Sequence, residues 1–584
     1  MHRSDSPNKY LPTFTFAFIV AMTSLAGNSH AATETTDTEE LRNRARQEAL
    51  DRERQQQAPS VNLQGEVPKV GPAQLPVSEI PCFTVQHFVL EVPAKLSPAA
   101  QRYGASTSRW DTFRFAQDYL EQFSGQCIGR EGINFIVRGL TAKILERGYS
   151  TTRIGIPEQD MLSGVLKLTL VPGIIHELRF ADAATTGTWK NAFPTSAGKL
   201  LNLRDLEQGL EQMKRVTSQE VDIQIVPAGD LGESDVIISV KRSKPWKAII
   251  NLDDSGAKGT GKLQAGLQLG WDNLLNANDL LNIGTGSDAD RNSHERGTQG
   301  YNFSYSVPYG YWTTTVSAND YTYHQRIMGA VQSFVSSGKS QSYEAKVNYL
   351  FHRDQFSKSS LQFRTAQRAS HSYIDDTEVE VQKRNTTLAE LALIHKHNIG
   401  EAQIDTTLAY RWGAPWFGAQ ADPSDLSATS PRYRYKLETL DVALVLPFKL
   451  YEHRYSYNAT FRAQNTNMAL YASEWFAIGN RWTVRGFDGE FSLGAEKGFF
   501  LRNEIDMPIL GTAQTVYAGL DFGKVYGDNV QNLIGNKLAG FALGLKGNMA
   551  QGLMYEVFAG VSLYKPQKYN TDSPAAGFSL MYQM

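Results

Sequence analysis

The stretch GKLQAGLQLGW (261–271) alternates between two classes of side chain at every position after Lys262. One class is apolar and consists of Leu263, Ala265, Leu267, Leu269 and Trp271. The other class is polar or small and consists of Gln264, Gly266, Gln268 and Gly270. Because successive side chains of a β-strand point to opposite faces, this stretch predicts a strand with one apolar face and one polar face.

The same alternation continues to the end of the chain, as in SYEAKVNYLF (342–351), RYSYNATFRA (454–463) and the final FSLMYQM (578–584). It covers roughly 340 residues, which is enough for about 16 strands of 9–11 residues with their loops. A soluble sandwich of this size would need a second apolar pattern. We therefore expect residues 245–584 to form a transmembrane β-barrel of about 16 antiparallel strands.

The amino terminus has the features of a signal peptide. Arg3 and Lys9 precede an apolar stretch, Phe14 to Ala26, and Ser29-His30-Ala31 resembles a cleavage site. The alternative, a first membrane helix, requires a longer apolar stretch. We expect residues 1–31 to be removed and the mature chain to be exported.

Residues 32–57 contain TEELRNRARQEALDRERQQQ (38–57), which has no Gly or Pro and carries opposite charges at helical spacing. Such a helix is polar nearly all round, so it is either a solvated spacer or a helix housed in a wet, polar place. Residues 58–78 are rich in proline and predict a semi-extended linker.

Two small α+β modules follow, at 79–172 and 173–244. The first predicts a strand at 83–92, helices at 113–123 and 133–149, and strands at 151–157 and 164–173. The second predicts a strand at 174–182, a helix at 203–216, and strands at 221–229 and 234–242. Such modules often present a sheet edge or groove to an extended peptide, although they could also be spacers.

The chain has two cysteines, Cys82 and Cys127, and both fall in the first module. An exported chain meets an oxidising compartment, where two cysteines usually form a disulfide. Two unrelated free thiols are the alternative.

The stretch RWTVRGFDGE (481–490) carries more charge than a connecting loop needs. Strand parity turns Tyr517, Gly519, Asp521 and Gly523 toward the barrel lumen. The same parity turns Arg502, Glu504 and Asp506 inward. We expect Arg485 to meet Asp521 in a bidentate pair, with Gly486 passing close to the wall and Phe487 beside it. Spacing alone fits a solvated extracellular Arg485 equally well.

Composition and motifs exclude several classes of function. The formal net charge of −2 offers no basic excess for nucleic acid. We find no G-x-S-x-G, H-E-x-x-H, P-loop or metal-spaced Cys/His set, so we expect no enzyme, catalytic residue, cofactor or metal site. Transport without an ATP site would draw its free energy from another source, such as folding of a partner outside the cell.

Several motifs together resemble one family. They are FAIGNRWTVRGFDGE (476–490), GLDFG (519–523), RGYSTTRIGIPEQDMLSGVLKLTLVPG (147–173) and NLDDSG (251–256). With the order of segments, they resemble the TpsB transporters of two-partner secretion, within the BamA superfamily. The branch most similar is the CdiB/ShlB/FhaC type, which exports contact-dependent inhibition toxins and haemolysins.

The resemblance implies a site and a set of partners. Two POTRA domains in the periplasm would capture an unfolded TpsA exoprotein, and the amino-terminal helix would plug the barrel. Arg485 and Asp521 would form a loop–wall salt bridge, with Val484, Gly486 and Phe487 completing the loop motif. The other expected partners are outer-membrane lipid and the barrel-assembly machinery, and we expect a monomer.

Two alternative functions remain open, and two residues depart from the pattern of the family. An insertase of the BamA type commonly has more POTRA domains and no plugging helix, whereas a passive porin has no use for such domains. Asn480 stands where many relatives have a second glycine, and Met584 ends a chain that usually ends in an aromatic residue.

Overall fold

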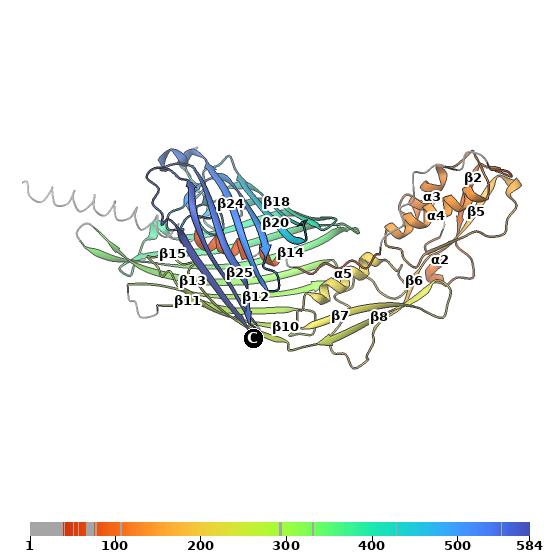
Figure 1. Cartoon of the computed structure of the whole chain (residues 1–584), viewed down its shortest axis with the longest axis horizontal. Helices are drawn as coiled ribbons and strands as arrows, with labels where there is room; N and C mark the ends of the chain where they lie inside the picture. Colours follow the sequence, from red (N-terminus) through yellow and green to blue (C-terminus); the bar gives the residue numbers. More distant parts are fainter. Residues whose placement is uncertain are drawn as a thin grey trace, which may run out of the picture.

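The computed structural model describes residues 39, 41–50, 52–55, 58–65, 75, 79–104, 108–290, 295–329, 332–427, 429–550 and 552–584. The expected signal peptide, 1–31, lies outside these residues. A barrel occupies one end of the molecule and two small modules occupy the other, with α5 (Leu203–Lys214) of the second module beside the barrel (Figure 1). None of the described helices is long and apolar enough to cross a bilayer.

Sixteen strands of the described chain close into the barrel, all paired antiparallel. They are β9 (Trp246–Asp253), β10 (Gln264–Asp272), β11 (Leu280–Asp288), β12 (Arg296–Tyr309), β13 (Trp312–Met328), β14 (Ser333–Arg353), β15 (Ser357–Ile374), β17 (Arg384–Ile399), β18 (Ala402–Gly413), β19 (Lys436–Leu450), β20 (His453–Asn465), β23 (Lys497–Pro508), β24 (Gln514–Tyr526), β25 (Lys537–Ala550), β26 (Leu553–Tyr564) and β27 (Ala575–Gln583). The short β16 (Thr377–Glu378) pairs antiparallel with the end of β15. The last strand, β27, pairs with β9 from Ser579 opposite Asp253 to Gln583 opposite Ile249, which closes the ring.

The alternation of the sequence corresponds to the two faces of this barrel. In β10 the side chains of Leu267, Leu269 and Trp271 are exposed on the outer wall. In β24 Leu520 is likewise exposed, whereas Asp521 is buried inside. An apolar outer surface suits lipid and a polar interior suits water, as expected for a barrel that spans a membrane.

The first module contains two sheets. The larger has the order β2 (His87–Glu91), β5 (Val165–Val171) and β4 (Arg153–Gly155), and the smaller pairs β1 (Phe83–Val85) with β3 (Gln126–Ile128). The helices are α2 (Pro98–Gln101), α3 (Arg114–Glu121), α4 (Arg130–Glu146) and the single turn η1 (Met161–Ser163). Leu120, Ile136 and Leu168 lie in its fully buried core.

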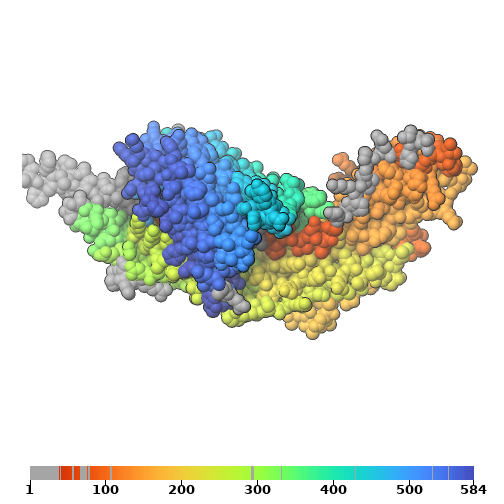
Figure 2. Space-filling view, viewed as in Figure 1, coloured from red at the N-terminus to blue at the C-terminus, as the bar shows by residue number. Residues whose placement is uncertain are grey.

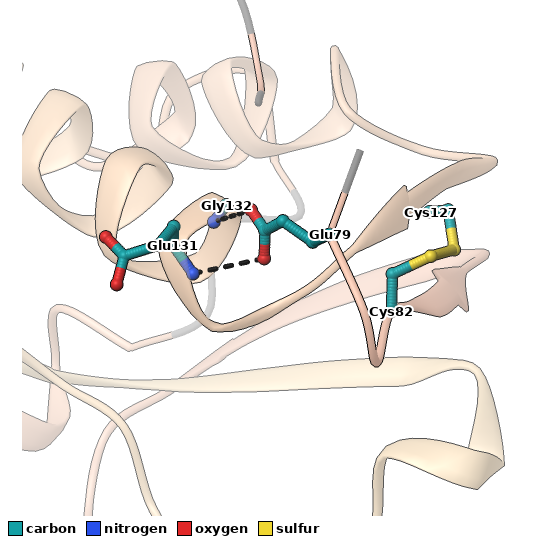
Figure 3. The surroundings of a disulfide bond; sticks show 5 residues. All are labelled: Glu79, Cys82, Cys127, Glu131 and Gly132. Carbon is teal, nitrogen blue, oxygen red and sulfur yellow. Dashed lines mark hydrogen bonds between the residues drawn. A yellow bond between two sulfur atoms is a disulfide. The ribbon is translucent and has the colours of Figure 1, made fainter. Parts of the chain in front are cut away.

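The predicted strand at 83–92 is interrupted at Gln86. The backbone N–H groups of Gln86 and His87 both donate to the carbonyl oxygen of Gly164, so the chain turns from one sheet to the other there. Cys82 and Cys127 form a disulfide beside the smaller sheet (Figure 3). In the same view the carboxylate of Glu79 accepts from the backbone N–H groups of Glu131 and Gly132 and so caps α4.

The second module is simpler than the first. Its sheet has the order β6 (Ile174–Phe180), β8 (Glu233–Arg242) and β7 (Gln219–Pro227), and α5 (Leu203–Lys214) covers it. Asn202 caps α5 by accepting from the N–H of Arg204. Leu206, Leu210 and Met213 of α5 pack on the sheet. Most of the remaining side chains of α5 are also buried, because the helix meets the barrel and the linker as well.

Candidate functional site

The barrel lumen holds a helix of the chain's own amino-terminal segment. Residues 41–50 and 52–55 are helical, and Figure 1 shows this segment in red inside the barrel. Its sequence explains this position, because a helix with charge on nearly every face needs polar surroundings. The charged lumen wall supplies them.

Ion pairs join the helix to well-separated parts of the wall. Arg46 pairs with Asp253 of β9 at 3.2 Å, Arg52 pairs with Asp441 of β19 at 3.4 Å, and Glu48 pairs with Arg462 of β20 at 2.5 Å. Glu48 and Arg52 are among the opposite charges at helical spacing in this segment. In the structure both side chains have ion-pair partners on the barrel wall, Arg462 for Glu48 and Asp441 for Arg52.

The helix fills the lumen closely on the side of β20. The gap between its Leu41–Arg52 face and residues such as Gln464 and Phe500 is about 30 Å³. A space of that size holds about one water molecule. The helix therefore packs closely against this part of the wall.

The long connection between β20 and β23 also folds into the barrel. It contains η3 (Ala472–Glu474) and a small hairpin of β21 (Phe476–Ile478) with β22 (Leu493–Ala495). Ile478, Val484 and Phe487 are buried in an apolar cluster with residues of the wall. Phe487 meets Tyr569 edge-on at 5.4 Å between ring centroids. The cluster anchors the charged tip of the connection beside β24.

Arg485 of this tip lies against Asp521 of β24. Its Nε donates to Asp521 Oδ2 at 2.7 Å and its Nη2 donates to Asp521 Oδ1 at 2.9 Å, a bidentate pair. The backbone N–H of Arg485 also donates to Asp521 Oδ2 at 2.9 Å. The side chains are 4% and 1% exposed, so both charges are shielded from water. We call this pair the latch.

The charged side chains of β23 that were predicted to face the lumen lie near the latch. Glu504 pairs with Arg485 and, at 2.8 Å, with Lys546 of β25. Asp506 also pairs with Lys546, at 2.9 Å. Arg502 instead donates to the carbonyl oxygen of Trp482 at 3.2 Å. Sequence reasoning did not single out Lys546, which lies on the strand beyond β24.

Glycines make room for the latch. A Cβ on Gly519 would lie 2.2 Å from Nη2 of Arg485, and one on Gly523 would lie 2.8 Å from Val484. Gly486 has a φ of +92° and passes so close to β26 that a Cβ would meet the carbonyl oxygen of Val561 at 2.5 Å. Gly540 and Gly560 leave similar space for the tip, and sequence reasoning missed both. The sequence alone carries no signal for them, because only the register of the sheet sets Gly540 opposite Asp521.

The helix and the latch loop touch each other. Arg42 donates to the carbonyl oxygen of Gly489 at 2.7 Å, four residues after Arg485. Arg44 donates to the carbonyl oxygens of Ser473 and Trp475 at the other end of the connection. Asn480, where the resemblance implied glycine, accepts from the N–H of Trp482 and has no positive φ. Asparagine therefore serves this turn without strain.

Comparison with known proteins identifies the family. The description "Haemolysin secretion/activation protein ShlB/FhaC/HecB" matches residues 232–547, and two POTRA descriptions match residues 109–173 (ShlB-type) and 174–227. The chain belongs to the ShlB/FhaC/HecB family. It is 42% identical to the outer membrane transporter CdiB-2 of Burkholderia pseudomallei (strain 1026b) over 543 residues, 92% of each chain. It is 29% identical to the hemolysin transporter protein ShlB of Serratia marcescens, over 68% of this chain and 71% of that one.

Solved structures agree with this family. CdiB from Escherichia coli is similar with a TM-score of 0.82 and 25% identity, and CdiB from Acinetobacter baumannii with 0.81 and 26%. Each match covers 94% of this chain and 99% of the other. The family makes the chain a two-partner secretion transporter of the outer membrane, not an enzyme, with a cognate TpsA exoprotein. The two modules are POTRA domains, which are periplasmic in this family.

Proposed function

We propose that residues 32–57 act as a plug that closes the lumen at rest and leaves it when the cognate TpsA partner is exported. The POTRA domains capture the unfolded partner in the periplasm, and the partner passes through the barrel and folds outside without ATP. In this proposal the linker spans residues 58–78, POTRA 1 spans 79–172, POTRA 2 spans 173–244 and the barrel spans 245–584.

The observation that carries the proposal is the seating of the helix in the lumen. Its contacts reach β9, β19, β20 and the latch loop, so the plug bridges opposite parts of the barrel. They are mainly ion pairs and hydrogen bonds rather than apolar packing. A helix held in this way is able to leave, because water and the lumen's own charges replace its partners at modest cost.

The latch has a different role in the proposal. Arg485 and Asp521 hold the loop tip against the wall, and Val484, Gly486, Phe487, Gly519 and Gly523 shape the contact. Arg502, Glu504 and Asp506 complete the charged wall around it. With the loop held against the wall, the plug occupies the lumen at rest. After the plug has left, the partner passes through the same space.

The partner that fits best is a large exoprotein of the contact-dependent inhibition or haemolysin class. This follows from the relatives, which are CdiB transporters and the hemolysin transporter ShlB. We also propose that the barrel sits in outer-membrane lipid as a monomer and that the barrel-assembly machinery inserts it.

Conductance tests the plug. Protein lacking residues 35–57 should conduct ions in planar bilayers far more than the wild type, because the lumen is then open. Leu50→Ala, which trims an exposed side chain of the same helix, should leave conductance low. Equal conductance of the deletion and the wild type would contradict the proposal.

A further inference from the structure

Residues 61–63 of the linker are bound to POTRA 2 through their backbone. The backbone N–H of Val61 donates to Glu211 Oε1 at 2.6 Å, and the N–H of Leu63 donates to Glu207 Oε1 at 2.9 Å. The carbonyl oxygen of Val61 accepts from Nη2 of Arg353 at 2.8 Å. The side chains of Val61 and Leu63 pack on the POTRA 2 core, whereas Asn62 between them is exposed.

The spacing of the two carboxylates matches an extended chain. Glu207 and Glu211 are four residues apart on α5, which places them about 6 Å apart along the helix axis. Residues two apart in an extended chain are separated by about 6.6 Å. The two carboxylates therefore accept from the N–H groups of residues two apart in an extended chain. An apolar side chain at each of those two residues packs on the POTRA 2 core. Recognition of this kind depends on the backbone more than on the sequence.

The site is charged, buried and complete without the linker. Glu207 is 1% exposed and Arg353 is 2% exposed. Arg353 pairs with Glu207 at 3.1 Å and with Glu211 at 2.7 Å, Arg204 pairs with Glu207 at 3.0 Å, and Lys358 pairs with Glu211. Each carboxylate keeps a cationic partner when the linker departs. Exchange of one strand for another therefore leaves no buried charge unpaired.

The site also lies between the barrel and POTRA 1. Gln208 and Gln212 of α5 both donate to the carbonyl oxygen of Gly310, in the turn between β12 and β13. On the other side, Gln64 donates to the carbonyl oxygen of Leu145 in POTRA 1. Figure 2 shows the red amino-terminal segment at the surface between the barrel and POTRA 2. A strand held here lies at the mouth of the barrel and next to both POTRA domains.

We propose that Glu207, Glu211 and Arg353 form a capture site for an extended segment of the unfolded exported partner, with apolar residues two positions apart, and that the linker occupies this site until the partner displaces it. The inference rests on the proposed function and adds to it the place of capture and a competitor. Displacement frees the chain at Val61, six residues beyond the last described helical residue of the plug. Capture of a partner and release of the plug are therefore coupled.

A peptide with the linker's own sequence tests the site. The probe is fluorescent APSVNLQG (residues 58–65), and its anisotropy is measured with full-length protein in detergent. Wild-type protein should bind it weakly, because the tethered linker competes at high effective concentration. Val61→Asp/Leu63→Asp removes the competitor and should tighten binding on the order of tenfold or more. Asn62→Asp, at the exposed position, should behave as the wild type.

Two further measurements complete the test. Adding Glu211→Ala to Val61→Asp/Leu63→Asp should abolish the gain in peptide affinity, and an amino-terminal fragment of the cognate partner should displace the peptide from the released protein. Equally weak peptide binding to the wild type and to Val61→Asp/Leu63→Asp would overturn the proposal, as would a fragment that leaves the peptide bound. Peptide binding does not depend on export, so a transporter that exports normally but fails these tests contradicts this inference alone.

Discussion

Arg485 is the residue on which the loop position depends most. Its guanidinium meets Asp521 in two bonds and Glu504 in another, and Nη2 also donates to the carbonyl oxygen of Asn503 at 3.1 Å. Asp521 lies almost wholly out of water. A buried carboxylate that loses its cation keeps the full cost of its desolvation.

Arg485→Ala should therefore abolish secretion while the barrel still assembles. The loss leaves Asp521 with only backbone N–H donors, at a cost of roughly 3–5 kcal/mol. Partner in the culture medium measures export, and heat-modifiable gel mobility measures assembly. Arg326→Ala is the matched control, since its pair with Glu295 is 44% and 61% exposed and contributes little. Normal export by Arg485→Ala would count against the latch.

Gly519→Ala should weaken the same contact by crowding. The added Cβ would lie 2.2 Å from Nη2 of Arg485, whose partners leave it little freedom to move. We expect a loss of about 1–3 kcal/mol, measured as a lower midpoint of denaturant unfolding, with reduced export. Gly300→Ala in β12, where the nearest atoms are 3.5 Å away, is the control. The prediction fails if both alanine variants unfold at the same midpoint.

The sequence predicts the wall residues of the latch because the face of a strand to which a side chain points depends only on its position along that strand. Parity places Asp521, Gly519 and Gly523 on one face without knowledge of the fold. It does not say which distant residue meets them. Gly540, Gly560 and Lys546 lie on neighbouring strands, so only the register of the sheet brings them to Arg485.

At the scale of elements, two contacts hold the ends of the linker. Near its carboxyl end the disulfide of Cys82 and Cys127 fixes the chain beside α4, where Glu79 caps the helix (Figure 3). Near its amino end Val61 and Leu63 lie on α5. The prolines of the linker predict only a semi-extended spacer. The sequence does not predict its contacts with α5, because they involve residues more than 140 positions away.

Removal of the disulfide should destabilise POTRA 1. The bridge joins residues 45 positions apart, and a loop of that length corresponds to about 3–4 kcal/mol in the chain-entropy model. Cys82→Ser/Cys127→Ser should lower the urea concentration at which protease cuts POTRA 1, with cleavage of POTRA 2 as the internal control. An unchanged midpoint for POTRA 1 would refute this expectation.

The contact between the linker and α5 should persist in mild acid. Burial alone would raise the pKa of Glu211. The hydrogen bond from Arg353 and the nearby charges of Arg353 and Lys358 outweigh this effect, so the pKa of Glu211 lies below its ordinary value. A carboxylate whose pKa is lowered in the folded state stabilises the contact at every pH above the ordinary carboxyl pKa. This stabilisation is lost as the pH falls through the pKa of the folded state. Glu207 and Arg204 face the same site.

Protease protection of residues 58–65 measures this dependence. Protection should be constant from about pH 8 to pH 5 and fall only below about pH 4. Glu211→Gln should weaken protection at neutral pH and reduce the step in acid. Loss of protection near pH 6–7 in the wild type would contradict the assignment to Glu211.

At the scale of the whole molecule, the charged plug, the latch and the POTRA domains form one contact network. The plug meets the latch loop through Arg42 and Gly489, and α5 meets both the linker and the barrel. The alternation of the sequence predicted the barrel, because alternation is a local periodicity. It predicted neither the break at Gln86 nor β3, because both depend on pairing between distant segments.

Reconstitution tests the central claim, that this chain carries its partner across a membrane unaided by ATP. Full-length protein is placed in liposomes with the POTRA domains outward, and an unfolded fragment of the cognate TpsA partner is added outside, followed by protease. The account predicts that the fragment becomes protected with wild-type protein and not with Arg485→Ala, and that unrelated outer-membrane barrels supplied in the same way stay unfolded. A fragment that remains fully digestible with the wild type, or unrelated barrels that fold instead, would contradict it.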